Sequence, residues 1–330
     1  MKKRRRSISR KPFCLLILPL IILLTAGSAS AYDEDTHFLL TYVMCRAVGF
    51  TEKEALTIAA VDQGMDDSDA TNAHDGAKPR VSEEWMWHAL DKDGKMGTAG
   101  VLARRDALFN EAVTEKDARL RLIRLGIFFH FQQDTWAHRH HEKDSHLSPD
   151  KFITFNTPAG HAAFGPQPDR PPLDPVAALI CVAEGVRYAS EFMTRAMGRT
   201  PNVFFKSYTF TGGKIDEAWK DKRQGKFFNQ IGLTGLAPNS AGLFLASLIR
   251  AQIDAYPASR SPNPMFFGKS TADKYDLEDM RAGLQKVCTL FKSQIGAITL
   301  PSESDKNALG FTELTTQKLL SLAPGNSPVN

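Results

Sequence analysis

The 330-residue chain has few cysteines, and none of them lie close together in the sequence. The four are Cys14, Cys45, Cys181 and Cys288, so the chain has no CxxC pair of the kind that forms thiolate zinc sites. Only three of them follow residue 31, which permits at most one intramolecular disulfide and excludes a disulfide framework. Any bound metal ion is therefore expected to have nitrogen and oxygen ligands.

The N-terminal apolar run is too short to cross a bilayer as a helix. It spans residues 14–27, well short of the roughly 20 residues required, and Pro19 interrupts it. The basic segment MKKRRRSISRKPF precedes it and the small residues Ala29, Ser30 and Ala31 follow, which is the order of a secretory signal peptide. We expect cleavage after Ala31, a mature chain that begins at Tyr32, and a periplasmic or extracellular location; an uncleaved anchor is the alternative.

A basic surface is also missing once residues 1–31 are set aside. Those residues hold seven Lys or Arg and no acid, so the other 299 residues have 34 basic and 37 acidic side chains and a net charge of −3. This balance argues against a stable nucleic-acid complex held by a basic surface. We expect a single helical metal-binding domain over residues 32–300, a polar tail over 301–330, and no transmembrane segment after processing.

Helical periodicity dominates the chain and predicts an all-α fold, a multi-helix bundle with long ordered loops. Helices are expected at residues 36–48, from a capping box at Thr51 and Glu54 through residue 61, and at 118–138, 175–197, 240–255 and 277–295. Gly126 is the weak point of the 118–138 helix. Loops are expected at 64–79 and 151–175, and a short strand near 203–210.

All nine histidines fall between His37 and His161, which is less than half of the predicted mature chain. His130, Asp134 and His138 are spaced i, i+4, i+8 on a predicted helix, so successive side chains turn only about 40° around its axis. They share an otherwise apolar face, and a buried charge there needs a partner, which a divalent cation supplies. The alternatives are a hydrogen-bonded Asp–His pair in a core and a His-rich segment that binds metal adventitiously.

Three more segments carry candidate ligands. His88 lies in WMWHALD, residues 85–91, among large apolar side chains. His37 lies five residues after Tyr32, so the new N-terminal amine and the imidazole could reach one ion. A bridging carboxylate could come from the acidic segment, for which a solvated or calcium-binding turn is the alternative; its members are Asp62, Asp66, Asp67 and Asp69.

In this order, the motifs Tyr32-x4-His37, the Asp-rich segment, WHALD and His130-x3-Asp134-x5-His140 resemble the secreted zinc-dependent phospholipase C and S1/P1 nuclease superfamily. The resemblance covers roughly residues 32–169. It implies a helical phospholipase C/P1 nuclease-like fold in which three zinc ions hydrolyse phosphodiesters and phosphomonoesters. In that family the processed N-terminal residue binds zinc through its amine and carbonyl.

By this resemblance, Tyr32 and His37 hold one zinc ion with His130 and Asp134, and Asp134 bridges to a second ion. The resemblance gives the remaining metal positions to His88, His140, Asp66 or Asp67, and the pair His146 and Asp150.

Two departures from the family pattern leave alternatives open. This chain offers Tyr32 where the family usually has Trp. The family also has a proline before the third histidine of its central motif, and DTWAHRH, residues 134–140, lacks it. The helix face therefore favours His138 as a ligand, whereas the family spacing favours His140. The chain also resembles an uncharacterised bacterial group with DTWAH and GH…PD motifs, in which case His161 and Asp169 replace His146 and Asp150.

The expected activity is phosphoester hydrolysis with two or three Zn²⁺ ions that lower the pKa of a bound water to about 7. Asp66 or Asp67 is the expected general base. The substrate could be a phospholipid, a nucleic acid or a small phosphoester. The main alternative is an exported, non-catalytic metal-binding or interaction protein with structural ions. A helical hydrolase built on His-Asp dipeptides has only His74-Asp75 in its favour.

Overall fold

The computed structural model describes residues 35–68, 71, 74–75, 78–79, 85–91, 97–140, 153–154, 175–205, 240–255, 277–302 and 304–305. Most of these residues are helical, which confirms the predicted all-α fold class. The predicted signal peptide, residues 1–31, and residues 306–330 of the predicted tail lie outside the described residues.

The chain enters the described part through a π-helical turn, η2 (Asp35–Leu40), which continues into α2 (Thr41–Val48). The predicted capping box then opens α3 (Glu52–Asp67): the Thr51 hydroxyl accepts from the Glu54 amide, and the Glu54 carboxylate accepts from the Thr51 amide at 2.8 Å. The predicted loop from residue 64 is wrong over its first four positions. Helix α3 continues to Asp67 because Met65 is fully buried and holds this last turn against the core.

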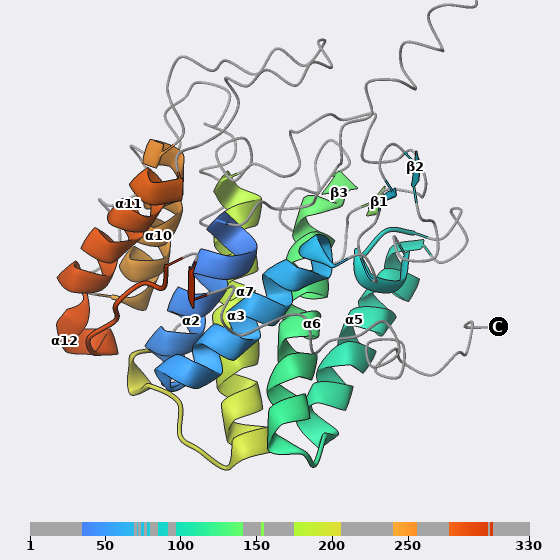
Figure 1. The fold of residues 1–330 in the computed structure, drawn as a ribbon, viewed down its shortest axis with the longest axis horizontal. Coiled ribbons are helices and arrows are strands. Elements are labelled where there is room, and N and C mark those ends of the chain that lie inside the picture. Colours follow the sequence, from blue (N-terminus) through green and yellow to red (C-terminus); the bar gives the residue numbers. More distant parts are fainter. Residues whose placement is uncertain are drawn as a thin grey trace, which may run out of the picture.

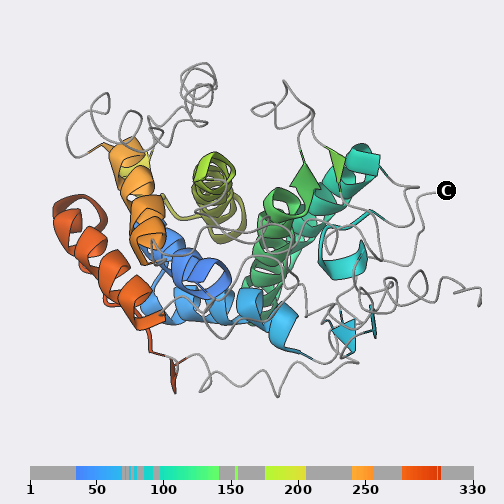
Figure 2. The ribbon, with the colours of Figure 1, turned by 90° about the horizontal axis from the view of Figure 1, so that it is seen from above.

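Helices α5 (Gly97–Thr114) and α6 (Ala118–Ala137) lie side by side (Figures 1 and 2). Asp117 caps α6 by accepting from the amides of Arg119 and Leu120 at 2.9 and 2.8 Å. The sequence did not predict α5, because its buried apolar face is sparse, consisting of Val101, Leu108, Phe109 and Ala112.

The C-terminal helices α7 (Pro175–Met197), α10 (Ala241–Ala255), α11 (Leu277–Leu290) and α12 (Lys292–Ile295) agree with the predicted ones, apart from a break at Phe291. The predicted strand near 203–210 is wrong where it is described, since η5 (Val203–Phe205) is a 3₁₀ turn. The Asn202 side chain accepts from the Phe204 amide at 3.0 Å and so favours a turn. Residues 206–210 lie outside the described part.

The strands in the described part have two residues each. β1 (His74–Asp75) pairs antiparallel with β2 (Lys78–Pro79), with His74 opposite Pro79. β3 (Arg139–His140) pairs antiparallel with β4 (Ile153–Thr154), with His140 opposite Ile153. The second pair ties the chain just after α6 to a short part of the predicted 151–175 loop, the rest of which is not described.

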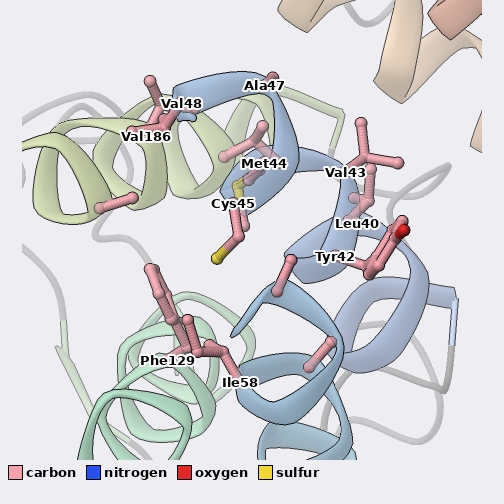
Figure 3. Packing of buried hydrophobic residues seen from close by; sticks show 14 of the residues in the cluster. Leu40, Tyr42, Val43, Met44, Cys45, Ala47, Val48, Ile58, Phe129 and Val186 are labelled. Carbon is pink, nitrogen blue, oxygen red and sulfur yellow. The ribbon is translucent and has the colours of Figure 1, made fainter. Parts of the chain in front are cut away.

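The helices surround one apolar core. Helices α2, α3 and α7 lie between α5 and α6 on one side and α10 and α11 on the other (Figures 1 and 2). In Figure 3, Cys45 of α2 points toward Phe129 of α6 and Ile58 of α3, while Val48 lies beside Val186 of α7. Among the helices that the structure describes, none has the length and hydropathy that crossing a membrane requires.

Gly126 sets how closely α3 and α6 approach each other. A Cβ atom at this position would lie 2.6 Å from Val61 Cβ and 2.7 Å from the Ile58 carbonyl oxygen, so only glycine fits between the two helices. The residue that looked like a weak point of α6 is therefore the point of contact with α3. One to two turns further on, both helices place their polar side chains face to face.

Candidate metal centre

Seven polar side chains from four parts of the chain converge toward the C-terminal ends of α3 and α6. Six are buried and Asp66 is 10% exposed. The set consists of His37 from η2, Asp62 and Asp66 from α3, His88 after the helical turn at residues 85–87, and His130, Asp134 and His138 from α6 and its C-terminal cap. Six of them, all but Asp62, were named by the sequence analysis as ligands or as the general base, and Asp62 belongs to the acidic segment named as a possible source of a bridging carboxylate.

His88, His130 and Asp134 form a compact ligand group. Their atoms His88 Nδ1, His130 Nε2 and Asp134 Oδ2 make a nearly equilateral triangle with sides of 3.0, 3.2 and 3.4 Å. A tetrahedral Zn²⁺ ion with bonds of about 2.0–2.1 Å requires neighbouring ligand atoms about 3.3–3.4 Å apart. These three side chains could therefore hold a metal ion with little movement.

A second group lies beside the first. His37 Nε2 is 3.7 Å from Asp66 Oδ2 and 3.6 Å from Asp134 Oδ1. The other oxygen of each carboxylate faces the first group: Asp66 Oδ1 is 3.6 Å from His88 Nδ1, and Asp134 Oδ2 is 3.2 Å from the same nitrogen. His37, Asp66 and His130 could hold a metal ion as well. Both carboxylates thus have the orientation of bridging ligands between two neighbouring positions.

The chemistry of these atoms fits a cation. Within the described residues, four buried atoms of the site have no hydrogen bond: both carboxylate oxygens of Asp134, Asp66 Oδ2 and His130 Nδ1. Leaving buried polar atoms unsatisfied is costly, and the cost is largest for a carboxylate. A divalent ion would give a partner to the unbonded atoms that face the centre. Imidazole nitrogens and carboxylate oxygens are ligand types that suit zinc and similar ions.

Outer contacts fix which nitrogen of two histidines faces the centre. His37 Nδ1 lies 2.9 Å from Asp62 Oδ1, and His88 Nε2 lies 2.9 Å from the Thr71 carbonyl oxygen. An ionised carboxylate and a carbonyl can only accept, so both histidine nitrogens donate. The opposite nitrogens, His37 Nε2 and His88 Nδ1, are left to face the centre, which is the outer-contact pattern typical of metal-ligating histidines.

His138 supports the site through the backbone. Its Nδ1 donates to the His88 carbonyl oxygen and lies 3.8 Å from Asp134 Oδ2. The residue after His88, Ala89, has a φ of 51°, a left-handed conformation that non-glycine residues rarely adopt. In the described residues, His138 belongs to neither group that could hold a metal. The contact of its Nδ1 holds the His88 turn, and His138 as a ligand stays a prediction.

Burial and neighbouring charges drive the pKa values of the cluster apart. Burial lowers the pKa of His37, but Asp62, Asp66 and Asp134 outweigh it and raise this pKa to about 10. Burial raises the pKa of Asp66 to about 7 and lowers that of His130 to about 4. Burial also raises the pKa of Asp134, but the nearby histidines outweigh this effect and hold that pKa well below its usual range. Such divergence is common at functional sites.

Asp67 does not reach the centre. It is exposed on α3 and accepts from Gln63 Nε2 at 3.2 Å. Consecutive helical residues point about 100° apart, so Asp66 and Asp67 cannot both face the same site. Of the two residues predicted as the general base, only Asp66 therefore faces the site.

The other predicted ligands are not placed by the structure. The backbone of His140 is in β3, but its side chain lies outside the described residues. The remaining predicted ligands, Tyr32, His146, Asp150, His161 and Asp169, also lie outside them.

Asp62 takes part in the site in a way that the sequence did not predict, together with Thr41 and Gln133. Asp62 Oδ2 accepts from Thr41 Oγ1 at 2.6 Å and from Gln133 Nε2 at 3.0 Å, and all three side chains are buried. The spacing of Asp62 and Asp66 at i, i+4 was visible, but it signals a shared helix face only if α3 extends past residue 61.

Comparison with known proteins leaves the activity open. The chain matches a protein-family model described as a family of unknown function, DUF6765, over residues 32–96. No curated protein and no solved structure matches the chain. The matched stretch contains His37, Asp62, Asp66 and His88, whereas the α6 ligands His130 and Asp134 lie beyond it.

Proposed function

We propose that this protein is an exported, zinc-dependent phosphoester hydrolase with a carboxylate-bridged centre of at least two ions. The observation that carries the proposal is the close approach of His88 Nδ1, His130 Nε2 and Asp134 Oδ2, with His37 and Asp66 beside them and the second oxygen of Asp134 facing His37. The order of motifs that resembles the phospholipase C and S1/P1 nuclease superfamily supports the reaction type and the same bundle fold. The N-terminal pattern of residues 1–31 supports export.

The first group has the composition of a catalytic site. Structural zinc sites close the coordination with four protein ligands, whereas catalytic sites supply three and leave a position open. His88, His130 and Asp134 supply three close ligand atoms, and Asp66 stands at 3.6–3.8 Å from the two histidine nitrogens. Paired divalent ions, when bound, lower the pKa of a coordinated water to about 7 and neutralise charge on a phosphoryl oxygen.

Asp66 lies on the more exposed side of the centre. Its side chain is 10% exposed, whereas those of His37, His130 and Asp134 are fully buried. A carboxylate at the open side can orient a water molecule and accept its proton, so Asp66 is the general base of the proposal. The closed side of the centre consists of the outer contacts to Asp62 and Thr71.

The proposal is tested on purified protein that begins at Tyr32. We expect at least two zinc ions per chain by elemental analysis, and hydrolysis of bis-p-nitrophenyl phosphate, p-nitrophenyl phosphate or phosphatidylcholine vesicles that a chelator abolishes and zinc restores. Asp66→Asn should lower kcat by about 100-fold or more, as loss of a general base does. Asp67→Asn, which makes the same change one residue away on the exposed face, should leave kcat unchanged.

A different result would favour the rival function, an exported protein with structural metal ions. The rival predicts full zinc occupancy, loss of the fold on chelation, and no hydrolysis of any of these phosphoesters. Absence of bound zinc in the purified protein, together with no binding on titration, would reject both.

A further inference from the structure

We infer that Asp62 is a positioning residue that orients both His37 and His130 toward the metal centre from behind their rings. The inference rests on the proposed metal centre and adds to it a residue that binds no ion itself. Asp62 is fully buried in α3, one helical turn before Asp66. The two carboxylates differ in which edge of the imidazole rings they face.

The rings of His37 and His130 stand between these two carboxylates. Asp62 Oδ1 lies 2.9 Å from His37 Nδ1 and 3.6 Å from His130 Nδ1. Asp66 faces the opposite edges, at 3.7 Å from His37 Nε2 and 3.8 Å from His130 Nε2. The ring centroids are 4.5 Å apart, so one carboxylate can serve both rings. Asp62 is thereby separated from the centre by the width of an imidazole, too far to be the bridging ligand.

Asp62 is itself held in place. Its Oδ2 accepts from Thr41 Oγ1 at 2.6 Å and from Gln133 Nε2 at 3.0 Å, which leaves Oδ1 for the histidines. Gln133 Nε2 also lies 2.5 Å from Thr41 Oγ1, so the three side chains form one buried network. Gln133 neighbours Asp134 on α6, and Thr41 begins α2. The network therefore holds the Asp62 carboxylate of α3 against both α2 and α6.

This arrangement predicts a definite ligand form. Because the Asp62 carboxylate can only accept, it holds the proton of His37 on Nδ1 and leaves Nε2 to bind metal. The same carboxylate lies 3.6 Å from Nδ1 of His130, and His130 is a member of both candidate groups. Asp62 therefore influences both metal positions at once, whereas the Thr71 carbonyl influences only His88.

Metal affinity is the first test. Zinc is titrated into the metal-free full-length mature protein against a chromophoric chelator. Asp62→Asn should weaken binding at both positions by about 10- to 100-fold, the usual effect of losing an outer-shell partner. Thr41→Val, which removes one of the two donors that hold Asp62, should weaken it less. Asp67→Asn changes the same charge on the exposed side of α3 and should match the wild type. Wild-type affinities in Asp62→Asn would overturn the inference.

The second test needs no metal. In the metal-free wild type, the proton on His37 Nδ1 should give a downfield, slowly exchanging NMR resonance, because it is buried and bonded to a carboxylate. The resonance should move upfield in Asp62→Asn and disappear in Asp62→Ala, while Asp67→Asn keeps it. An unchanged resonance in Asp62→Ala would overturn the inference and leave the proposed metal centre standing. If the wild type binds no zinc, the proposed function fails, and this resonance still decides whether Asp62 orients His37.

Discussion

Two helix pairs in this protein pack closely and bury opposite kinds of side chain. Where α10 meets α11, the buried residues are hydrocarbons such as Phe244, Leu248 and Leu284. Where α3 meets α6, the C-terminal halves of the helices bury carboxylates and imidazoles instead. Apolar burial stabilises the first pair by about 25 cal/mol per Å². Charges buried without full pairing destabilise the second, and a cation bound at this polar face would offset that cost.

The largest test of this comparison is Asp134→Asn. Asp134 faces both candidate positions, so the substitution should remove both zinc ions and lower any zinc-dependent hydrolysis by more than about 100-fold. Asp254→Asn is the matched control on α10, because Asp254 is 57% exposed and pairs with Arg250 of the same helix. Elemental analysis of both variants gives the answer. Two zinc ions retained by Asp134→Asn would mean that the polar face serves something other than metal binding.

Much of this contrast is visible in the sequence. The capping box at Thr51 defines the start of α3, and the i, i+4, i+8 spacing on α6 by itself indicates a shared polar face. Convergence of His37 and His88 on that face is expected from their residue types and their setting. These features are local, or follow from one helix at a time.

What the sequence did not show depends on contacts between elements. Whether Asp62 or Asp66 faces the ligand edge of a histidine is decided by the position of η2, not by helical spacing. His138 shares the helix face of Asp134, yet its Nδ1 is engaged by a carbonyl 50 residues earlier in the chain. Gly126 looked unfavourable because helix propensity describes only the destabilising effect of glycine within α6. It does not include the close approach of α3 that Gly126 permits.

A pair of glycine substitutions sharpens the comparison at the level of packing. Gly126→Ala places its Cβ 2.7 Å from the Ile58 carbonyl oxygen, a backbone atom that cannot move aside, so we expect a loss of about 1–3 kcal/mol in unfolding free energy. Gly283→Ala meets only Ala251 Cβ at 3.3 Å and gains helix propensity, so its unfolding free energy should stay within about 1 kcal/mol of the wild type. Denaturant unfolding measures both.

The outcome at Gly126 also bears on the site. Forcing α3 away from α6 separates Asp66 from His130, so Gly126→Ala should weaken zinc binding as well as the fold, whereas Gly283→Ala should not. Equal stability of the two variants would show that the two helix pairs tolerate separation alike and that Gly126 has no special place.

The last test is a pH dependence confined to the polar pair. The pKa of His37 is raised to about 10, and that of His88 is also raised, because nearby carboxylates outweigh the effect of burial. A raised pKa means that the bound proton stabilises the folded state. This stabilisation is complete below about pH 6.5, the ordinary histidine pKa, and is lost as the pH rises toward the pKa in the folded state. The metal-free protein should therefore lose stability from about pH 7 to 8.5, by at most about 1.4 kcal/mol per pH unit for each histidine.

The other shifted groups of the centre do not mask this loss. Asp66, with a pKa raised to about 7, loses its remaining proton within the window and so adds to the loss in the same direction, and His130, with a pKa of about 4, is neutral throughout it. Helices α10 and α11 contain no histidine. Zinc takes the place of these protons, so the loaded protein should show a flat profile. Urea unfolding with chelator and with stoichiometric zinc at three pH values measures the difference, and a flat metal-free profile would show that the buried carboxylates do not hold these protons.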